Sequence, residues 1–159
     1  MADNQNDIEK RLSKLEDELA IQKVVYNYCY KQDQRNIEEF LKLLTDDIVF
    51  TFPGWGVDVR GKETLKDFFL EQVFATHEYH MHQISNLNMQ IEDGNAEGEA
   101  YLSMQSSCGG EPQEAGIRYI LKLRKENNQW KLSEIHCRLV TWKGTLAPKE
   151  DSVFERFKI

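Results

Sequence analysis

The second half of this sequence alternates long strand-forming segments with short polar connections. Four segments are rich in β-branched and aromatic residues: HQISNLNMQI (82–91), AEGEAYLSMQSS (96–107), GIRYILKLRK (116–125) and WKLSEIHCRLVTW (130–142). The connections EDGN, CGGEPQEA and ENNQ contain the glycine, proline and asparagine that are typical of turns. Long strands joined by short connections pair with their neighbours in sequence. The pattern therefore predicts an antiparallel meander.

The first half shows helical spacing instead. From residue 8 to about residue 31, apolar residues recur in steps of four, three and four and form one stripe, at Ile8, Leu12, Leu15 and Leu19. A second helix is predicted in NIEEFLKLL (36–44), where Asn36 can cap the first turn and Glu39 lies three residues later. A third is predicted in KETLKDFFLEQVF (62–74).

The order of these elements predicts the fold class. A short strand, DIVFTF (47–52), lies between the second and third helices and is ended by Pro53 and Gly54. Helices followed by a long sheet are typical of α+β proteins, with the helices packed on one face. A sheet of such long strands must twist and curl, and its concave side then forms a pocket.

Length and charge restrict the partners. The chain has 159 residues, so we expect one domain over residues 1–159. Its net charge of −7 argues against nucleic acid, and no apolar stretch reaches the length of a membrane span. The first ten residues lack the apolar core of a signal peptide, which predicts a cytoplasmic protein. Three cysteines without CxxC spacing predict free buried thiols, at Cys29, Cys108 and Cys137.

The apolar stripe of the first helix also bears on assembly. Charged residues crowd its early turns, so the stripe docks on the chain's own sheet or on a partner subunit. Because the stripe is longer than a small sheet requires, we expect a homodimer or homotrimer.

Three of the four histidines lie in THEYHMHQISN (76–86). On a strand His80 and His82 point to the same face, and with His77 they have a spacing that metal ligands use. Apart from Glu78, however, no carboxylate or thiol lies close in sequence, so a metal site is the less favoured alternative. For His82 a second role is open: an imidazole held by a carboxylate is a base with a fixed tautomer. The other two histidines are otherwise predicted at an exposed connection.

A candidate carboxylate lies at the end of the first helix, in VVYNYCYKQDQRN (24–36). Asp33 opposes the helix dipole there, so local stability does not explain it. The alternative is a solvated loop acid. The nearby tyrosines, Tyr26, Tyr28 and Tyr30, are core residues by default.

The last strand offers a cation. Side chains alternate between the two faces of a strand, so the even-numbered residues of this segment share one face. That face carries Arg138 and His136 together with the apolar side chains Trp130, Leu132, Val140 and Trp142. An arginine there must be paired or face a wet pocket. The alternative is a β-bulge that turns Arg138 outward.

Three stretches carry a resemblance to a known family: 15–52, 60–69 and 82–102. Together they resemble the SnoaL-like domains of the nuclear transport factor 2-like superfamily, over about Leu15 to Arg138. The nearest branch holds scytalone dehydratase, bile-acid dehydratase and hexachlorocyclohexane dehydrochlorinase. The marks are Ile21 followed twelve residues later by Asp33, and His82 followed four residues later by Asn86.

The resemblance implies an α+β cone, in which three to four helices lie over the concave face of a strongly curved, mixed and mostly antiparallel sheet. It also implies an aspartate–histidine dyad that removes a proton without a metal or organic cofactor. His82 takes the place of the base and Asp33 that of the group that orients it. Tyr28 matches a tyrosine that assists the leaving hydroxyl, and Arg138 matches an arginine on the last strand.

The implied pocket is apolar and takes a small apolar or cyclic organic molecule. Its expected lining is Tyr26, Phe52, Trp55, Asn86 and Met104. The chain departs from the family where the bile-acid enzyme has an aspartate, near Met104, and a tyrosine, near Phe52, so its substrate is expected to differ. The resemblance implies a dehydratase-like lyase or an isomerase. The alternative is a non-catalytic binding or accessory domain, such as the small subunit of an oxygenase.

Overall fold

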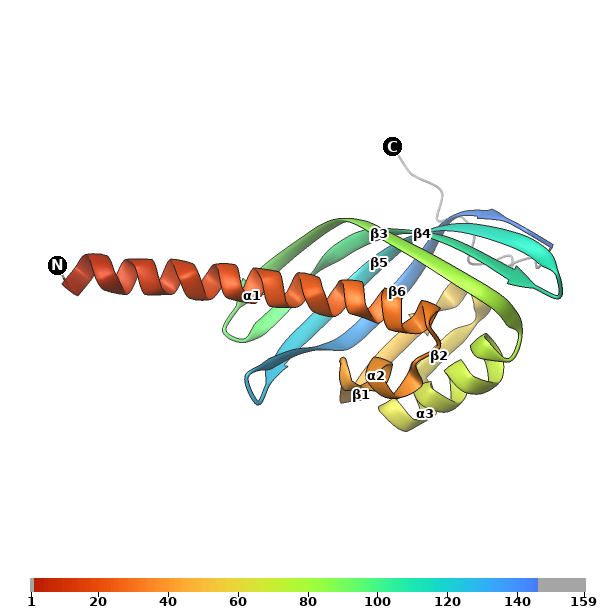
Figure 1. Ribbon diagram of the computed structural model, residues 1–159, viewed down its shortest axis with the longest axis horizontal. Coiled ribbons are helices and arrows are strands. Elements are labelled where there is room, and N and C mark those ends of the chain that lie inside the picture. Colours follow the sequence, from red (N-terminus) through yellow and green to blue (C-terminus); the bar gives the residue numbers. More distant parts are fainter. Residues whose placement is uncertain (1, 146–159) are drawn as a thin grey trace.

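The computed structural model describes the backbone of residues 2–145 and the side chains of residues 5–145 (Figure 1). Its helices are α1 (Ala2–Asp33), α2 (Ile37–Lys42) and α3 (Lys62–Phe68), with a 3-10 turn η1 (Pro53–Trp55) and a π-helical segment η2 (Phe69–Phe74). Its strands are β1 (Leu44–Phe52), β2 (Val57–Arg60), β3 (His77–Glu92), β4 (Asn95–Cys108), β5 (Glu111–Glu126) and β6 (Gln129–Lys143).

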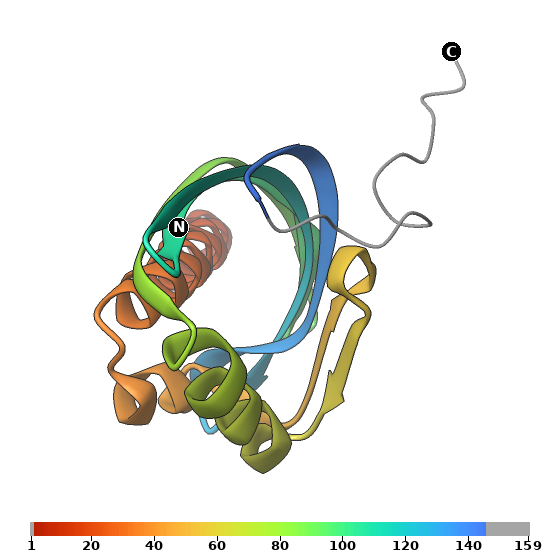
Figure 2. The same ribbon diagram turned by 90° about the vertical axis from the view of Figure 1, so that its right-hand side faces the viewer.

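The six strands form one curled sheet in the order β2-β1-β6-β5-β4-β3. The β1–β6 pair is parallel and the other four pairs are antiparallel. In the end view of Figure 2 the sheet curves into an open trough, and the helices close its open side. The predicted α+β cone with a mixed, mostly antiparallel sheet is thus confirmed.

Local sequence signals explain several boundaries. The Asn36 side chain accepts a hydrogen bond of 3.2 Å from the Glu39 backbone N–H, as the capping pattern predicts. Each hairpin of the meander turns through two residues with positive φ, the geometry of the tightest hairpin turns: Asp93–Gly94, Gly109–Gly110 and Asn127–Asn128. The connection predicted over 108–115 is therefore only two residues long, and β5 begins at Glu111. Strand β2 was not predicted.

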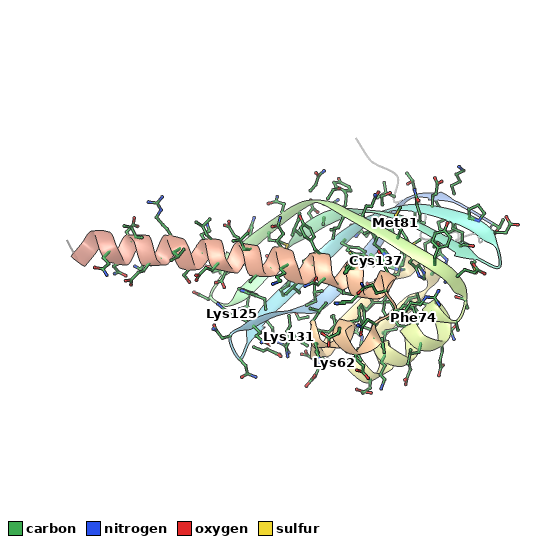
Figure 3. The ribbon with its side chains drawn as sticks, viewed as in Figure 1. Lys62, Phe74, Met81, Lys125, Lys131 and Cys137 are labelled. Atoms are coloured by element: carbon green, nitrogen blue, oxygen red, sulfur yellow. The ribbon has the colours of Figure 1, made fainter. Side chains whose placement is uncertain are left out.

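A polar contact fixes α1 against the sheet. The Asp17 carboxylate accepts hydrogen bonds of 2.7 Å from Lys125 Nζ and from Trp130 Nε1. Figure 3 shows Lys125 near the end of β5, beside α1. From there the C-terminal half of α1 runs along β3 and buries Ile21 and Val25 against the inner face of the sheet. This path brings the last residue of α1 to the middle of β3.

Two β-bulges in β6 overturn the predicted face of that strand. Pairing with β5 skips Ser133 and then Val140, and each extra residue reverses the inward direction. The inner face therefore carries Trp130, Leu132, Ile135, Cys137, Leu139 and Trp142. The alternative of a β-bulge that turns Arg138 outward is therefore confirmed: His136 and Arg138 lie between the two bulges on the outer side, not on the apolar face. There His136 Nδ1 hydrogen-bonds Thr51 Oγ1 at 2.8 Å.

The N-terminal half of α1 extends beyond the sheet (Figure 1). Its apolar stripe does not dock on the chain's own sheet: Ile8, Leu12, Leu15 and Leu19 are 53–65% exposed. Among residues 2–145, no helix is both long and apolar enough to cross a membrane.

We expect a second copy of this chain to cover the stripe. Steps of four, three and four are those of a coiled-coil seam, which is complementary to itself. In a parallel pair, Arg11 faces the acidic position of Glu16 and Glu18 faces the basic position of Lys23. Replacing both Leu12 and Leu15 with glutamate should give a monomeric mass by light scattering at micromolar concentration. Lys10→Glu with Lys14→Glu, which leaves the stripe intact, should not. A monomeric wild-type protein would contradict this expectation.

Candidate active site

The site is built on a two-point contact between a helix end and an edge strand. Asp33 is the last residue of α1, and its Oδ2 accepts a 3.0 Å hydrogen bond from the backbone N–H of His82. Its Oδ1 is hydrogen-bonded to Nδ1 of the same histidine. Because β3 is an edge strand, this backbone N–H is not required by the sheet. The carboxylate thus holds both the strand and the ring.

This contact has a chemical consequence for the ring. With Nδ1 donating to a carboxylate, the neutral imidazole carries its lone pair on Nε2. The His82 side chain is 2% exposed, so little water competes for that nitrogen, whereas the Asp33 side chain is 20% exposed. The arrangement suits a base whose conjugate acid is stabilised by an adjacent carboxylate.

An open groove of about 370 Å³ lies along the seam between α1 and β3. It is lined by Tyr26, Asn27, Cys29, Tyr30, Asp33, His82 and Ile84. The structure therefore brings predicted pocket residue Tyr26 together with Asp33 and His82, and it adds Tyr30. Both tyrosines are exposed, at 44% and 58%, although the sequence suggested core positions.

A row of four paired residues crosses the inner face from the histidine. His82 lies opposite Met104, Met104 opposite Ala115, and Ala115 opposite Trp142. The Trp142 ring meets Trp55 at 5.0 Å between ring centroids, and Trp55 meets Phe52 at 4.7 Å. Of the predicted pocket residues, Met104 thus lies beside His82. Phe52 and Trp55, together with Trp142, form an aromatic wall at the far end of the row.

Two predicted site residues lie elsewhere. Arg138 is exposed on the outer face of β6, because the bulge at Ser133 reverses the strand. Asn86 is exposed with φ of 52°, in a bulge between Ser85 and Asn88 of β3. A regular strand would have put it on the face of His82; the bulge does not.

Tyr28 is a core residue. It is 2% exposed, and its ring lies 5.1 Å from that of Phe40 and 6.4 Å from that of Tyr119. Burial raises the pKa of its hydroxyl well above the ordinary value, with a further contribution from neighbouring Cys137. The structure does not place Tyr28 among the groove-lining residues. Burial, with a smaller contribution from the charge of Asp33, likewise raises the pKa of the buried Tyr119 hydroxyl well above its ordinary value. Sequence reasoning missed Tyr119, although its alternation with Ile117 and Leu121 was a visible signal.

The three clustered histidines form a column of rings. The ring centroids of His77 and His80 are 4.5 Å apart, and those of His80 and His82 are 5.8 Å apart, with nearly parallel ring planes. The prediction that His80 is exposed is wrong, since it is 9% exposed. Burial, followed by the neighbouring His77, His82 and Arg35, lowers the pKa of His80 to about 3. Among the described residues, no group of three potential ligands is suited to hold a metal.

The sequence matches the family model of the SnoaL-like domain over residues 13–136. This chain belongs to that family. No curated protein sequence matches it. Among solved structures, a candidate scytalone dehydratase from Novosphingobium aromaticivorans is 19% identical, with a TM-score of 0.78 over 90% of this chain and 96% of that one. A type 2 hexachlorocyclohexane dehydrochlorinase is 16% identical, with a TM-score of 0.79 over 94% and 99%.

A third similar structure has a different description. It is a candidate aromatic ring hydroxylase from Novosphingobium aromaticivorans, 28% identical, with a TM-score of 0.77 over 83% of this chain and 95% of that one. The SnoaL-like fold of this chain is therefore shared by proteins that are named for different chemistry.

The neutral state of His80 makes stability depend on pH. An unfolded chain protonates this imidazole near pH 6.5, whereas the folded protein resists protonation down to about pH 3. The free energy of unfolding should therefore fall as the pH is lowered from 6.5 towards 3. In urea unfolding followed by tryptophan fluorescence, His80→Gln should reduce the fall between about pH 7 and 5, a range above the titration of most carboxylates. His136→Gln, on the outer face, should keep it. The same pH dependence in wild type and His80→Gln would contradict the burial of a neutral ring.

Proposed function

We propose that this protein is a cofactor-independent lyase or isomerase that removes a proton from carbon in a small, apolar, cyclic molecule. His82 is the base and Asp33 orients it. The observation that carries the proposal is the double hold of Asp33 on the ring and backbone of His82. A carboxylate at a helix C-terminus is unfavourable for the helix itself, so its place is better explained by what it does to the histidine.

The chemistry follows from this pair. Nε2 of His82 takes the proton, the C–H electron pair stays on the substrate carbon, and the Asp33 carboxylate stabilises the imidazolium that forms. The electron pair then expels a leaving group, or the proton returns at another carbon. Positioned proton transfer of this kind contributes about 10²–10⁴-fold in rate. The aromatic wall of Phe52, Trp55 and Trp142 supplies apolar surface for a ring-shaped substrate.

The named neighbours support a lyase. Dehydratases and dehydrochlorinases both release a small molecule after a proton is lost, and proteins with these names share the fold over nearly their whole length. Identities of 16–19% carry the fold alone, so the substrate of this chain is not taken from theirs.

A second candidate function is a non-catalytic binding or accessory domain. Its support is the outward direction of Arg138, because the cation expected to stabilise a developing negative charge is not on the inner face. The neighbour described as a candidate aromatic ring hydroxylase is consistent with this alternative, because the alternative includes the small subunit of an oxygenase.

Proton exchange on a bound ketone separates the two functions. Incubated with 2-tetralone in deuterated buffer and followed by NMR, the wild-type protein should speed deuterium incorporation beside the carbonyl. His82→Gln should lose about 10²-fold or more of this rate, since the base is gone. Asp33→Asn should lose most of it, because an amide donor at Nδ1 favours the wrong tautomer.

The controls are matched in chemistry and differ in position. His136→Gln removes a histidine on the outer face, and Asp58→Asn removes an exposed carboxylate of β2. Both should exchange like wild type. Equal exchange rates in all five proteins would reject the lyase or isomerase and leave the binding domain.

A further inference from the structure

The exposed stripe of α1 continues into the groove at the dyad. A helix presents nearly the same face every seven residues, so the face of Leu12 and Leu19 recurs at Tyr26 and again at Asp33. Tyr26 and Asp33 both line the groove. One face of α1 therefore runs from the projecting N-terminal half, where its apolar residues are exposed, to the carboxylate that holds His82.

The length of this face favours a pair of helices in which the groove end takes part. From Ile8 to Leu19 the stripe covers less than two heptads, whereas coiled-coil seams typically run over at least three to four. Continuation through Gln22 and Tyr26 to Tyr30 extends the face to about three heptads. The two tyrosines are 44% and 58% exposed, so both are available to a partner.

The charges beside the stripe favour a parallel pair of two identical helices. In that arrangement Arg11 faces the partner's Glu16, and Glu18 faces the partner's Lys23. Both contacts join opposite charges, and the two-fold axis repeats each of them. Figure 1 shows the N-terminal half of α1 projecting from the sheet, so a second helix can lie against it without displacing a strand.

The same register brings a second tyrosine to the groove. Gln22 lies in the seam and donates a 3.0 Å hydrogen bond to Tyr26 Oη, which adds a polar layer next to the tyrosine. A single polar layer in an apolar seam favours one register. In a parallel pair each Tyr26 faces the partner's Tyr26 across the two-fold axis. Because Tyr26 lines the groove, the partner's ring lies over the groove's open side.

We propose that α1 of a second copy of this chain packs parallel to α1 and covers the groove, so that the partner's Tyr26 completes the site. The inference rests on the proposed function for what the groove binds. In the single chain the Asp33 side chain is 20% exposed. Covering it removes water, and electrostatic interactions are stronger in a water-excluded site. Dimerisation thus becomes a condition for a complete site.

Disulfide trapping tests the direction of the pair. In the parallel arrangement the two thiols of a Gln22→Cys dimer face each other, within the range of a disulfide, and mild oxidation should link the chains. In an antiparallel pair centred on the stripe, the same positions would lie roughly 25 Å apart. Lys10→Cys, on the opposite face of α1, and the wild-type protein with its native cysteines should stay unlinked.

Hydroxyl-radical footprinting tests whether the groove is covered. In the wild-type dimer Tyr26 and Tyr30 should be protected from oxidation. Leu12→Glu with Leu15→Glu, which separates the helices far from the groove, should raise the oxidation rate of both tyrosines severalfold. Tyr101 of β4, which is 49% exposed, should react equally in the two proteins.

Ligand affinity tests whether the partner contributes to the site. The probe is 2-tetralone, and the monomeric double variant should bind it at least tenfold more weakly than the wild-type dimer. A tenfold loss corresponds to about 50–60 Å² of apolar ligand surface left in water. Lys10→Glu with Lys14→Glu should bind like wild type. Dilution of wild type below its dimerisation constant should reproduce the loss without any substitution.

The outcomes separate the cover from the dyad. If His82-dependent exchange is absent but the Gln22→Cys disulfide and the tyrosine protection are found, the base proposal fails and the cover stands. Exchange that persists while dimer and monomer bind 2-tetralone equally would overturn the cover. A monomeric wild type or an unlinked Gln22→Cys dimer would overturn it too. Tyrosines that stay protected in the monomeric variant would show that another part of the same chain covers the groove, which also contradicts the proposal.

Discussion

The contact between Asp33 and His82 is the interaction on which the site depends. It joins the last residue of a 32-residue helix to the edge strand of a curled sheet, and it uses both carboxylate oxygens. The Asp17 contact with Lys125 and Trp130 fixes the direction of α1 further upstream, so the end of the helix reaches β3 at the level of the histidine. The groove and the orientation of the ring both follow from this arrangement.

The inner face of the sheet changes character along its length. Its deep part, around Leu121 and Ile135, is apolar and fully buried. Towards the β4–β5 hairpin come the dyad and then the buried polar residues His80, Ser106 and Gln113, with the aromatic wall of Phe52, Trp55 and Trp142 on the far side. The inner face is therefore apolar at one end of the cone and carries buried polar side chains at the other. Such a division is typical of proteins in which binding or catalysis costs stability.

Much of the fold could be predicted from the sequence, because each signal was local. The stripe of α1, the cap at Asn36 and the alternation of the meander each depend on residues close together in the chain. The sequence left open whether a bulge turns Arg138 outward, and the positions of the bulges at Ser133 and Val140 could not be predicted, since neither carries a glycine or proline. The burial of His80, Ser106 and Gln113 in one row was missed because it depends on register across β3, β4 and β5. The Asp33–His82 pairing came from family resemblance, not from spacing alone.

The ¹⁵N NMR spectrum of the His82 ring shows whether Asp33 sets the tautomer of this histidine, because it reports which nitrogen carries the proton. The signal is assigned by its loss in His82→Gln. We expect the neutral form of the ring to carry its proton on Nδ1, with a bare Nε2, in the wild-type protein, and we expect the proton to move to Nε2 in Asp33→Asn. A wild-type ring protonated at Nε2, unchanged in Asp33→Asn, would show that the carboxylate does not set the tautomer and would contradict the assignment of His82 as the base.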